Sequence, residues 1–330
     1  MPRQARLDMP GALHHIMVRG INKSKIFQDD QDRERFLQRL GKTIIEAECT
    51  VHAWVLMGNH VHLLFKSGRG GISTVMRKLL TWYAQYFNRR HHRTGHLFEN
   101  RYKSILCEEE NYFLTLVRYI HLNPIRAKIV TTMSELNRYQ WGGHSAMMGK
   151  RDFACAWMDT AYVLAQFGTS KKLAQKAYQD FVQEGMQQGQ KPELTGGGLV
   201  RSLGGWSQVL SVRRRGEKAE YDERILGNGE FVNRVLRESE EKQIRQLKIK
   251  HEGVTIMRIV EQECTKGQIS PEELKSGSRR KKVSDLRSLI AWRGVRELGA
   301  SSAEIARNLG VATSSITRAM TKRELKGFDP

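Results

Sequence analysis

The sequence predicts an α+β fold built on an antiparallel sheet, and three observations favour this fold class. Two β-rich segments at 50–57 and 60–65 are separated by Gly58-Asn59, a dipeptide typical of tight hairpin turns. A further strand is expected at 13–18. Segments with helical periodicity lie before and after the hairpin, an order that favours helices packed on an antiparallel sheet.

The helices of this first region follow from apolar spacing and from residues that begin or end helices. A helix is expected at 33–48, after a pair of aspartates. Residues 72–90 repeat apolar side chains every three to four positions, as an amphipathic helix does. Another helix is expected at 112–126, ending near Pro124 because proline disfavours helical backbone in the residue before it.

The middle of the chain has a weaker pattern and is expected to be mainly helical. Helical segments are predicted at 173–186, 231–251 and 255–264, with a polar linker at 187–192 after the first. The glycines at 195–205 lack the strand, loop and helix context of a phosphate-binding loop, so we interpret them as turns.

The last part of the chain becomes regular again after a basic hinge at 276–282. Helices are expected at 285–298, 303–309 and 314–322, and Gly310 occupies the turn between the last two. Ser301 or Ser302 and then Thr313 can cap the last two helices. Helices of this length and spacing predict a helix-turn-helix. The chain is therefore divided into predicted domains at 1–148, 149–276 and 277–330.

Length and charge limit the function classes. With 330 residues, two or three domains are expected, and an apolar fraction of 39% with 8% aromatics can form real cores. Fifty-five Lys and Arg against 35 Asp and Glu give a net charge of +20. Such a field attracts polyphosphates, so nucleic acid is the favoured partner over an anionic membrane surface.

Cysteine usage and hydropathy indicate a cytoplasmic protein without a membrane partner. The four cysteines are scattered and show no C-x-x-C spacing, which argues against a zinc site or a disulfide framework. No apolar run approaches the roughly 20 residues of a membrane-spanning helix, and the first residues lack an apolar signal region.

A histidine pair gives the first indication of chemistry. His60 and His62 are two positions apart in a predicted strand, so both imidazoles project from one face while Val61 points into the opposite core. Two neutral imidazoles at this spacing can bind a divalent cation. Because an isolated pair is more often structural, the interpretation needs further context.

A tyrosine and an asparagine supply that context. Tyr119 and Asn123 are four residues apart on one predicted helix, so their side chains share a face. A phenol can be a nucleophile, and an amide oxygen can ligate a hard cation. Tyr112, two turns earlier, is the alternative nucleophile, and Tyr102 is a weaker one. Taken alone, the pair would more often be a core tyrosine and a helix-ending asparagine.

Together these motifs resemble a known family. The segment G-N-H-V-H-L-L-F at 58–65 resembles the His-hydrophobic-His motif of HUH single-strand endonucleases, and R-Y-I-H-L-N-P-I-R-A at 118–127 resembles the tyrosine helix of single-tyrosine transposases. Segments 10–20 and 93–103 are similar to REP-associated tyrosine transposases. The last helices resemble the C-terminal DNA-binding domain of the replication initiator DnaA.

The resemblance implies a fold and a reaction. The first domain would be an antiparallel-sheet HUH domain, ferredoxin- or RRM-like, and His60, His62 and Asn123 would hold Mg²⁺ or Mn²⁺. Tyr119 would attack a phosphodiester of single-stranded DNA near a palindromic hairpin and form a 5′-phosphotyrosine. The helix-turn-helix would bind duplex DNA.

DNA contacts are expected from side chains that flank the catalytic motifs or lie on the exposed face of the last helix. Their clustering with aromatic residues such as Trp82, Tyr83 and Tyr102 favours DNA, although a solvated charged face would explain many of them singly. The residues are Arg19, Arg77, Lys78, Arg89, Arg90, Arg101, Lys103, Ser314, Ser315, Thr317 and Arg318, with Arg93 in the same stretch.

Two other functions share some of these features. A DNA-binding transcriptional regulator without catalysis would explain the charge and the helix-turn-helix, but not a histidine pair, a tyrosine and an asparagine in motif context. A replication initiator or relaxase would share the metal motif. Such initiators often carry paired tyrosines and an attached helicase, and the sequence contains no Walker-type loop.

Overall fold

The computed structural model describes residues 7–150, 157–188, 194, 222, 224–251, 254–278 and 280–324, with only the backbone at 242–251, 321–322 and 324. The chain divides into two compact units, Met1–Asn233 and Arg234–Pro330, and each has its own hydrophobic core. The three-domain division expected from the sequence stays a prediction. No described helix combines the length and apolarity needed to cross a membrane.

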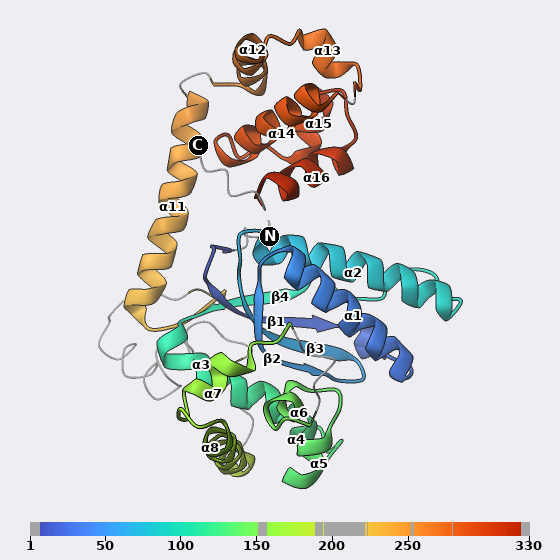
Figure 1. Cartoon of the computed structure of the whole chain (residues 1–330), viewed down its shortest axis with the longest axis vertical. Coiled ribbons are helices and arrows are strands. Elements are labelled where there is room, and N and C mark those ends of the chain that lie inside the picture. The colour runs from blue at the N-terminus through green and yellow to red at the C-terminus, as the bar shows by residue number, and fades with distance from the viewer. Residues whose placement is uncertain are drawn as a thin grey trace. The chain divides into compact units, whose positions relative to one another are not determined.

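The first unit is built on a five-stranded sheet with the order β2-β3-β1-β4-β5 (Figure 1). Its first four strands in this order pair antiparallel, and β5 pairs parallel with β4. The α+β fold class predicted from the sequence is therefore confirmed, although neither β4 nor β5 was expected. The strands are β1 (Leu13–Arg19), β2 (Thr50–Leu56), β3 (His60–Lys66), β4 (Lys103–Cys107) and β5 (Ile225–Leu226).

The register of β1 and β3 determines which side chains share a face of the sheet. Arg19 lies opposite His60 and Met17 opposite His62, so these side chains project to the same side. The Gly58-Asn59 hairpin is confirmed, since the backbone N–H of Met57 donates to the carbonyl of His60 at 2.8 Å directly across this two-residue turn.

Helices α1 (Asp30–Glu46) and α2 (Gly71–Arg90) cover one face of the sheet (Figure 1). The expected helix at 33–48 was placed too late, because the Asp29 carboxylate accepts a hydrogen bond from the Asp32 N–H and so caps the helix one turn earlier. A short 3₁₀ turn, η1 (Ile21–Lys23), follows β1.

The opposite face is covered by α3 (Glu109–His121), which packs on β2 and β3, and by helices that follow it (Figure 1). The helix expected at 112–126 begins three residues earlier than predicted and ends close to Pro124, as expected. Helix α3 stops at His121, and a separate short helix, α4 (Asn123–Arg126), follows Leu122. Pro124 has no N–H to donate to the carbonyl of Ile120, and the Asn123 side chain donates to that carbonyl instead, at 3.2 Å.

Residues beyond 130 complete the core of this unit. The helices are α5 (Met133–Arg138), α6 (Gly143–Met147), α7 (Thr160–Ala165), α8 (Lys171–Glu184) and the 3₁₀ turn η3 (Gly185–Gln187). Tyr178 of α8 is fully buried, and its hydroxyl lies 2.6 Å from Nδ1 of His121 and 3.0 Å from Nδ1 of His144. These hydrogen bonds connect the end of α3 to α6 and α8. The glycines at 195–205 and part of the polar linker lie outside the described residues.

The second unit is a helical bundle, and the helix-turn-helix expected at its end stays a prediction. The penultimate helix is capped by Ser301, whose hydroxyl accepts from the Glu304 N–H, and Gly310 has φ +63° in the turn. The basic hinge is shorter than expected, since Lys281 and Lys282 already belong to a helix. The helices are α11 (Gly229–His251), which crosses the unit boundary, α12 (Ile256–Gly267), α13 (Pro271–Lys275), α14 (Lys281–Arg296), α15 (Ser302–Asn308) and α16 (Thr313–Glu324).

Candidate active site

Three histidines lie together on the face of the sheet that α3 covers. His60 and His62 alternate with Val61 along β3, and their ring centroids are 5.1 Å apart. The fully buried His15 of β1 stacks on His62 with a centroid separation of 5.2 Å. Val61 is fully buried on the other side, as the strand periodicity predicts.

The phenol of Tyr119 contacts this histidine cluster. Its ring lies edge-on to both His62 and His15, with centroid separations of 6.1 and 5.9 Å. The side chain is half-buried and comes from α3, the helix packed on β2 and β3. Residues 57 positions apart in the sequence, Tyr119 and His62, are thus brought into one site.

Both histidines of the predicted metal pair are neutral near pH 7. Burial, with the positive charge of Arg19 as a smaller cause, lowers the pKa of His60 to about 4. Burial and the neighbouring His15, His60 and Arg19 hold the pKa of His62 well below 6.5. Neutral imidazoles are the form that ligates metals.

Hydrogen bonds select the nitrogen that His60 can offer to a cation. Its Nδ1 lies 2.6 Å from the side-chain oxygen of Asn59, and the Asn59 amide nitrogen donates to the carbonyl of Lys23 at 3.0 Å. The second bond orients the Asn59 amide, so its oxygen must accept the Nδ1–H of His60. Nε2 of His60 therefore carries the lone pair.

Asn123 and Arg126 surround Tyr119 on its own helix and the next. The Asn123 amide nitrogen donates to the carbonyls of Tyr119 and Ile120 at 3.0 and 3.2 Å, so the amide oxygen is the atom that could ligate a cation. The Arg126 guanidinium lies over the Tyr119 ring, 4.8 Å from its centroid, and donates to the Tyr119 carbonyl at 2.9 Å. The bond to the backbone carbonyl fixes Arg126 beside α3, and its guanidinium contacts the phenol ring.

The alternative nucleophiles lie elsewhere. Tyr112 is seven residues before Tyr119 on α3, which separates them by about 10 Å along the helix axis. Tyr102 is buried, and its hydroxyl lies 3.1 Å from Oγ of Ser73 at the start of α2, on the other face of the sheet. Tyr119 is the best-placed tyrosine of the three.

The donor atoms fit a divalent cation, but not a histidine- and carboxylate-only site. Among the described residues, no group of three or more His, Cys, Asp or Glu is arranged to hold a metal. A cation bound to His60 and His62 would therefore need oxygen ligands from an amide, such as that of Asn123, from water or from a phosphate. Two imidazole nitrogens suit Mn²⁺ better than Mg²⁺, which prefers oxygen ligands throughout.

Two of the basic residues predicted to bind DNA lie on strands with side chains on the histidine face. Arg19 is exposed beside His60, and exposed Lys103 on β4 is paired with Met17 in the register. Arg101 is exposed just before β4. A phosphate near His60 and His62 could therefore contact Arg19 directly.

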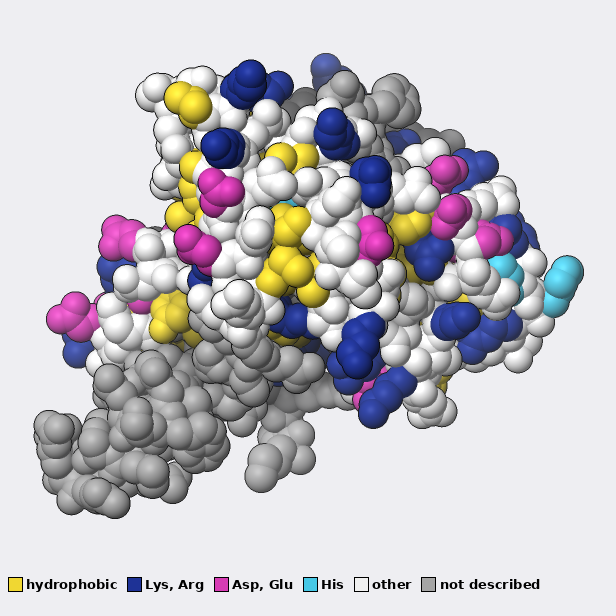
Figure 2. Space-filling model, turned by 90° about the horizontal axis from the view of Figure 1, so that it is seen from below, with side chains coloured by type: hydrophobic (Ala, Val, Ile, Leu, Met, Phe, Trp, Pro, Cys, Tyr) yellow, Lys and Arg dark blue, Asp and Glu magenta, His cyan; other side chains and the backbone are white. Residues whose placement is uncertain are grey.

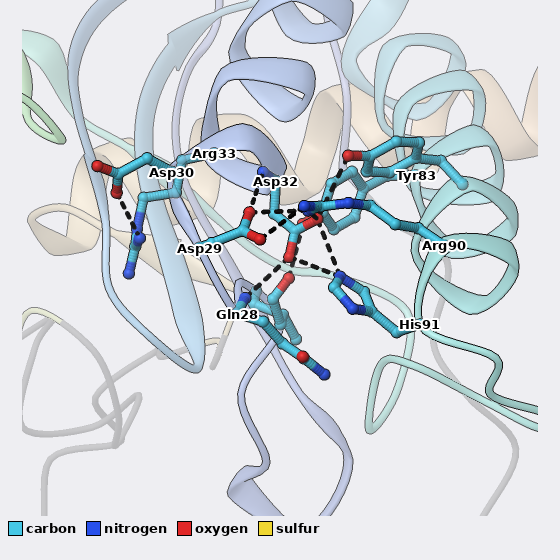
Figure 3. A network of polar contacts seen from close by, with 10 residues as sticks. Gln28, Asp29, Asp30, Asp32, Arg33, Tyr83, Arg90 and His91 are labelled. Atoms are coloured by element: carbon cyan, nitrogen blue, oxygen red, sulfur yellow. Dashed lines mark hydrogen bonds and ion pairs between the residues drawn. The ribbon is translucent and has the colours of Figure 1, made fainter.

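The other predicted DNA contacts of the first unit belong to α2, on the opposite face of the sheet. Arg77 and Arg89 are exposed, and Lys78 pairs with Glu46 at 3.2 Å. Arg90 is bound to two carboxylates, with nitrogen to oxygen distances of 2.6 Å to Asp29 and 2.5 Å to the buried Asp32 (Figure 3). The same Asp32 is 2.9 Å from His91, so Arg90 fastens α2 to the start of α1.

The aromatic residues near these basic side chains pack against other residues of the protein. Tyr83 is fully buried and its hydroxyl donates to the carbonyl of Ile26 at 2.7 Å. The Arg93 guanidinium lies 5.7 Å from the centroid of Phe87. Trp82 is half-buried and stacks on Tyr86, and the Arg39 guanidinium lies 5.4 Å from the centroid of the Trp82 ring.

Basic and acidic side chains are intermixed among the described residues that Figure 2 shows. They surround hydrophobic side chains near the centre of this view. Although the chain as a whole has a net charge of +20, the described side chains drawn in Figure 2 are of both signs. Local placement beside the histidines, as for Arg19, is the more specific indication of a phosphate site.

The predicted DNA-reading residues of the second unit lie along α16. Ser314 and Arg318 are exposed, whereas Ser315 and Thr317 are half-buried. The Thr317 hydroxyl donates to the carbonyl of Thr313 at 3.1 Å within the helix. Arg318 is the basic side chain of the four, and it is exposed.

The part of the chain that contains β1, the His-Val-His strand and the tyrosine helix is similar to known proteins. Residues 10–123 match the family described as transposase IS200 like. This confirms the transposase part of the predicted resemblance for that segment. Among curated proteins, none matches the chain. A solved structure of a REP-associated tyrosine transposase bound to a REP hairpin is similar at 14% identity and a TM-score of 0.38, covering 48% of this chain and 98% of that chain.

The IS200-like segment does not contain the whole site. His15, His60, His62, Tyr119 and Asn123 lie inside it, whereas Arg126 and the Leu194 carbonyl, which accepts from His15, lie beyond residue 123. Neither His15 nor Arg126 was assigned a role from the sequence. The alternation of His15 with Met17 and Arg19 on β1 could have indicated His15, because it shares their face.

Proposed function

We propose that the first unit is a single-strand DNA endonuclease and strand transferase of the transposase type. The observation that carries this proposal is the contact between the phenol of Tyr119 and the neutral imidazole of His62. A core tyrosine would not need two lone-pair-bearing imidazoles beside it. A nucleophile that attacks a metal-bound phosphate would.

In this proposal Tyr119 Oη attacks the phosphorus of a phosphodiester. The new bond joins the phenolic oxygen to the 5′-phosphate, the bond from phosphorus to the 3′ oxygen breaks, and the phenolic proton is transferred in net terms to the released 3′-hydroxyl. The ester is retained, so attack by a 3′-hydroxyl can reverse the step and join strands. Arg126 is anchored by its bond to the Tyr119 backbone carbonyl and holds the phenol in place through its contact with the ring.

His60 and His62, with Asn123 as a third ligand, would hold Mn²⁺ or Mg²⁺. The bound cation would polarise a non-bridging phosphate oxygen and favour ionisation of the nearby phenol, whose ordinary pKa is about 10. Arg19, exposed next to His60, would bind the same or an adjacent phosphate. The roles of all these residues are part of the proposal.

The substrate and the second DNA contact follow from the sequence resemblance. We infer a single-stranded substrate with a palindromic hairpin at the first unit. For the second unit we infer duplex DNA, contacted by α16 through Ser314, Ser315, Thr317 and Arg318.

The test compares two tyrosines of the same helix. Full-length protein is incubated with labelled single-stranded hairpin oligonucleotides and Mn²⁺, and covalent adducts are separated on denaturing gels. Wild type and Tyr112→Phe should form an adduct, whereas Tyr119→Phe should bind DNA without forming one. His60→Ala should lose both cleavage and metal dependence.

Two results would change the proposal. An adduct that persists in Tyr119→Phe but disappears in Tyr112→Phe would transfer the nucleophile to Tyr112. Specific DNA binding by wild type without any adduct, across hairpin substrates and both metals, would favour a regulator that lacks catalysis.

A further inference from the structure

A chain of hydrogen bonds runs from a backbone carbonyl through His15 to His62. Nδ1 of His15 lies 3.2 Å from the carbonyl oxygen of Leu194, and Nε2 of His15 lies 3.0 Å from Nδ1 of His62. Both imidazoles are buried, and their rings are stacked. The order of these bonds determines where the protons reside.

The carbonyl sets the direction of the chain. A carbonyl oxygen can only accept, so Nδ1 of His15 must carry the proton. A fully buried imidazolium would lose the stabilisation of its charge by water, which favours the neutral form of His15. Neutral His15 with a proton on Nδ1 has its lone pair on Nε2. The His62 Nδ1–H then donates to that lone pair, which places the free lone pair of His62 on Nε2.

We propose that His15 is a positioning residue that fixes His62 in the tautomer with a metal-binding Nε2. The inference rests on the proposed function, since it assigns His15 to the cation site of the same reaction. Asn59 fixes the tautomer of His60 in the same way, because its side-chain oxygen accepts from Nδ1 of His60 while its amide nitrogen donates to the Lys23 carbonyl. His62 depends instead on a neighbouring strand and on Leu194, which lies outside the IS200-like segment.

The expected effect can be bounded from similar supports of metal ligands. Removal of a group that hydrogen-bonds a ligating histidine typically weakens metal affinity by about 10- to 100-fold. Without His15, the proton of His62 could occupy either nitrogen, and its Nδ1–H would be buried without this acceptor. The imidazole would also lose the stacked ring that holds its plane.

The experiment measures Mn²⁺ binding to the full chain by calorimetry, without DNA. His15→Leu removes the acceptor, and His15→Gln retains a side-chain oxygen that can accept from His62. His14→Leu is the matched control, because His14 is equally buried on the same strand but faces the other side, with Nδ1 3.1 Å from Oγ of Ser104. His60→Ala identifies binding at the proposed cation site.

We expect His15→Leu to weaken Mn²⁺ binding about 10- to 100-fold, His15→Gln to recover part of that loss and His14→Leu to bind as wild type does. Equal binding by wild type and His15→Leu would overturn the inference, and so would equal weakening by His14→Leu and His15→Leu. If His60→Ala binds Mn²⁺ as wild type does, the proposed cation site itself fails, and the role of His15 fails with it. If only His15→Leu is without effect, the cation site stands and the role of His15 alone fails.

A second measurement avoids substitution altogether. The ¹⁵N spectrum of histidine-labelled wild type distinguishes the two tautomers of each neutral imidazole. A proton on Nδ1 of His62 in the metal-free protein supports the inference, and a proton on Nε2 overturns it even if a His15 variant fails to fold.

Discussion

Acid should destabilise the first unit well before its carboxylates titrate, because histidines are buried in neutral form. Burial lowers the pKa of His14 to about 4, and the imidazole is fully buried on β1. In the unfolded chain the pKa of this group returns to about 6.5. The unfolded state therefore binds a proton below pH 6.5 that the folded state does not, and stability falls as the pH falls through that value.

The size of the effect follows from these two pKa values. Between pH 7.5 and 5.5 the folded His14 stays neutral, while the unfolded one becomes largely protonated. The linkage amounts to about 1.3 kcal/mol over this interval, since one pKa unit corresponds to about 1.4 kcal/mol. His144, whose pKa is lowered to about 3 by burial, adds a similar amount. His62 and His121 act in the same direction.

Urea unfolding at the two pH values tests the His14 contribution through a difference of differences. His14→Leu should lose about 1.3 kcal/mol less stability between pH 7.5 and 5.5 than wild type does, whatever its stability at pH 7.5. His96→Gln, at an exposed position, should follow wild type. A His14→Leu protein with the same pH dependence as wild type would refute the reasoning.

Three further outcomes are expected at separate places in the chain. Arg126→Ala should slow adduct formation about tenfold by releasing Tyr119, and Arg126→Lys should have an intermediate rate. Single-turnover assays on denaturing gels measure these rates, and equal rates would contradict the positioning role. Gly41→Ala should destabilise by about 1–2 kcal/mol in urea unfolding, because its Cβ would lie 2.3 Å from Cδ1 of Trp157, yet should be neutral or stabilising in a Trp157→Ala background. Arg318→Ala should weaken duplex binding and reduce the salt dependence by about one phosphate contact, whereas an unchanged salt slope would remove Arg318 from the interface.

The parts of the site that the sequence could predict are those that depend on local periodicity. The strand period of two places His60 and His62 on one face and Val61 on the other, and the Gly58-Asn59 turn pairs their strand with its neighbour. The helical period likewise places Tyr119 on one face of α3. These relations hold over a few residues and need no knowledge of the tertiary structure.

The remaining parts depend on pairings between distant segments. β5 has only two residues and pairs with β4 across more than a hundred positions, so no local pattern marks it. Arg90 looks like a DNA contact in a basic sequence, but the fold places it against Asp29 and the buried Asp32. Charge alone cannot distinguish a basic side chain that binds phosphate from one that joins two helices.

The same distinction applies to the proposed metal ligands. A His-x-His strand provides two imidazoles on one face, but each imidazole has two nitrogens, and only one can face a cation. For His60 that choice is made by Asn59, its neighbour in the motif. For His62 it depends on His15 and, through it, on a carbonyl 132 residues further along the chain. Tyr178 of α8 also forms a hydrogen bond with His121 at the end of α3. Residues beyond the IS200-like segment therefore contact both α3 and, through His15, the strand β3. Helix α8 and Leu194 therefore belong structurally to the proposed site, although both lie beyond the IS200-like segment.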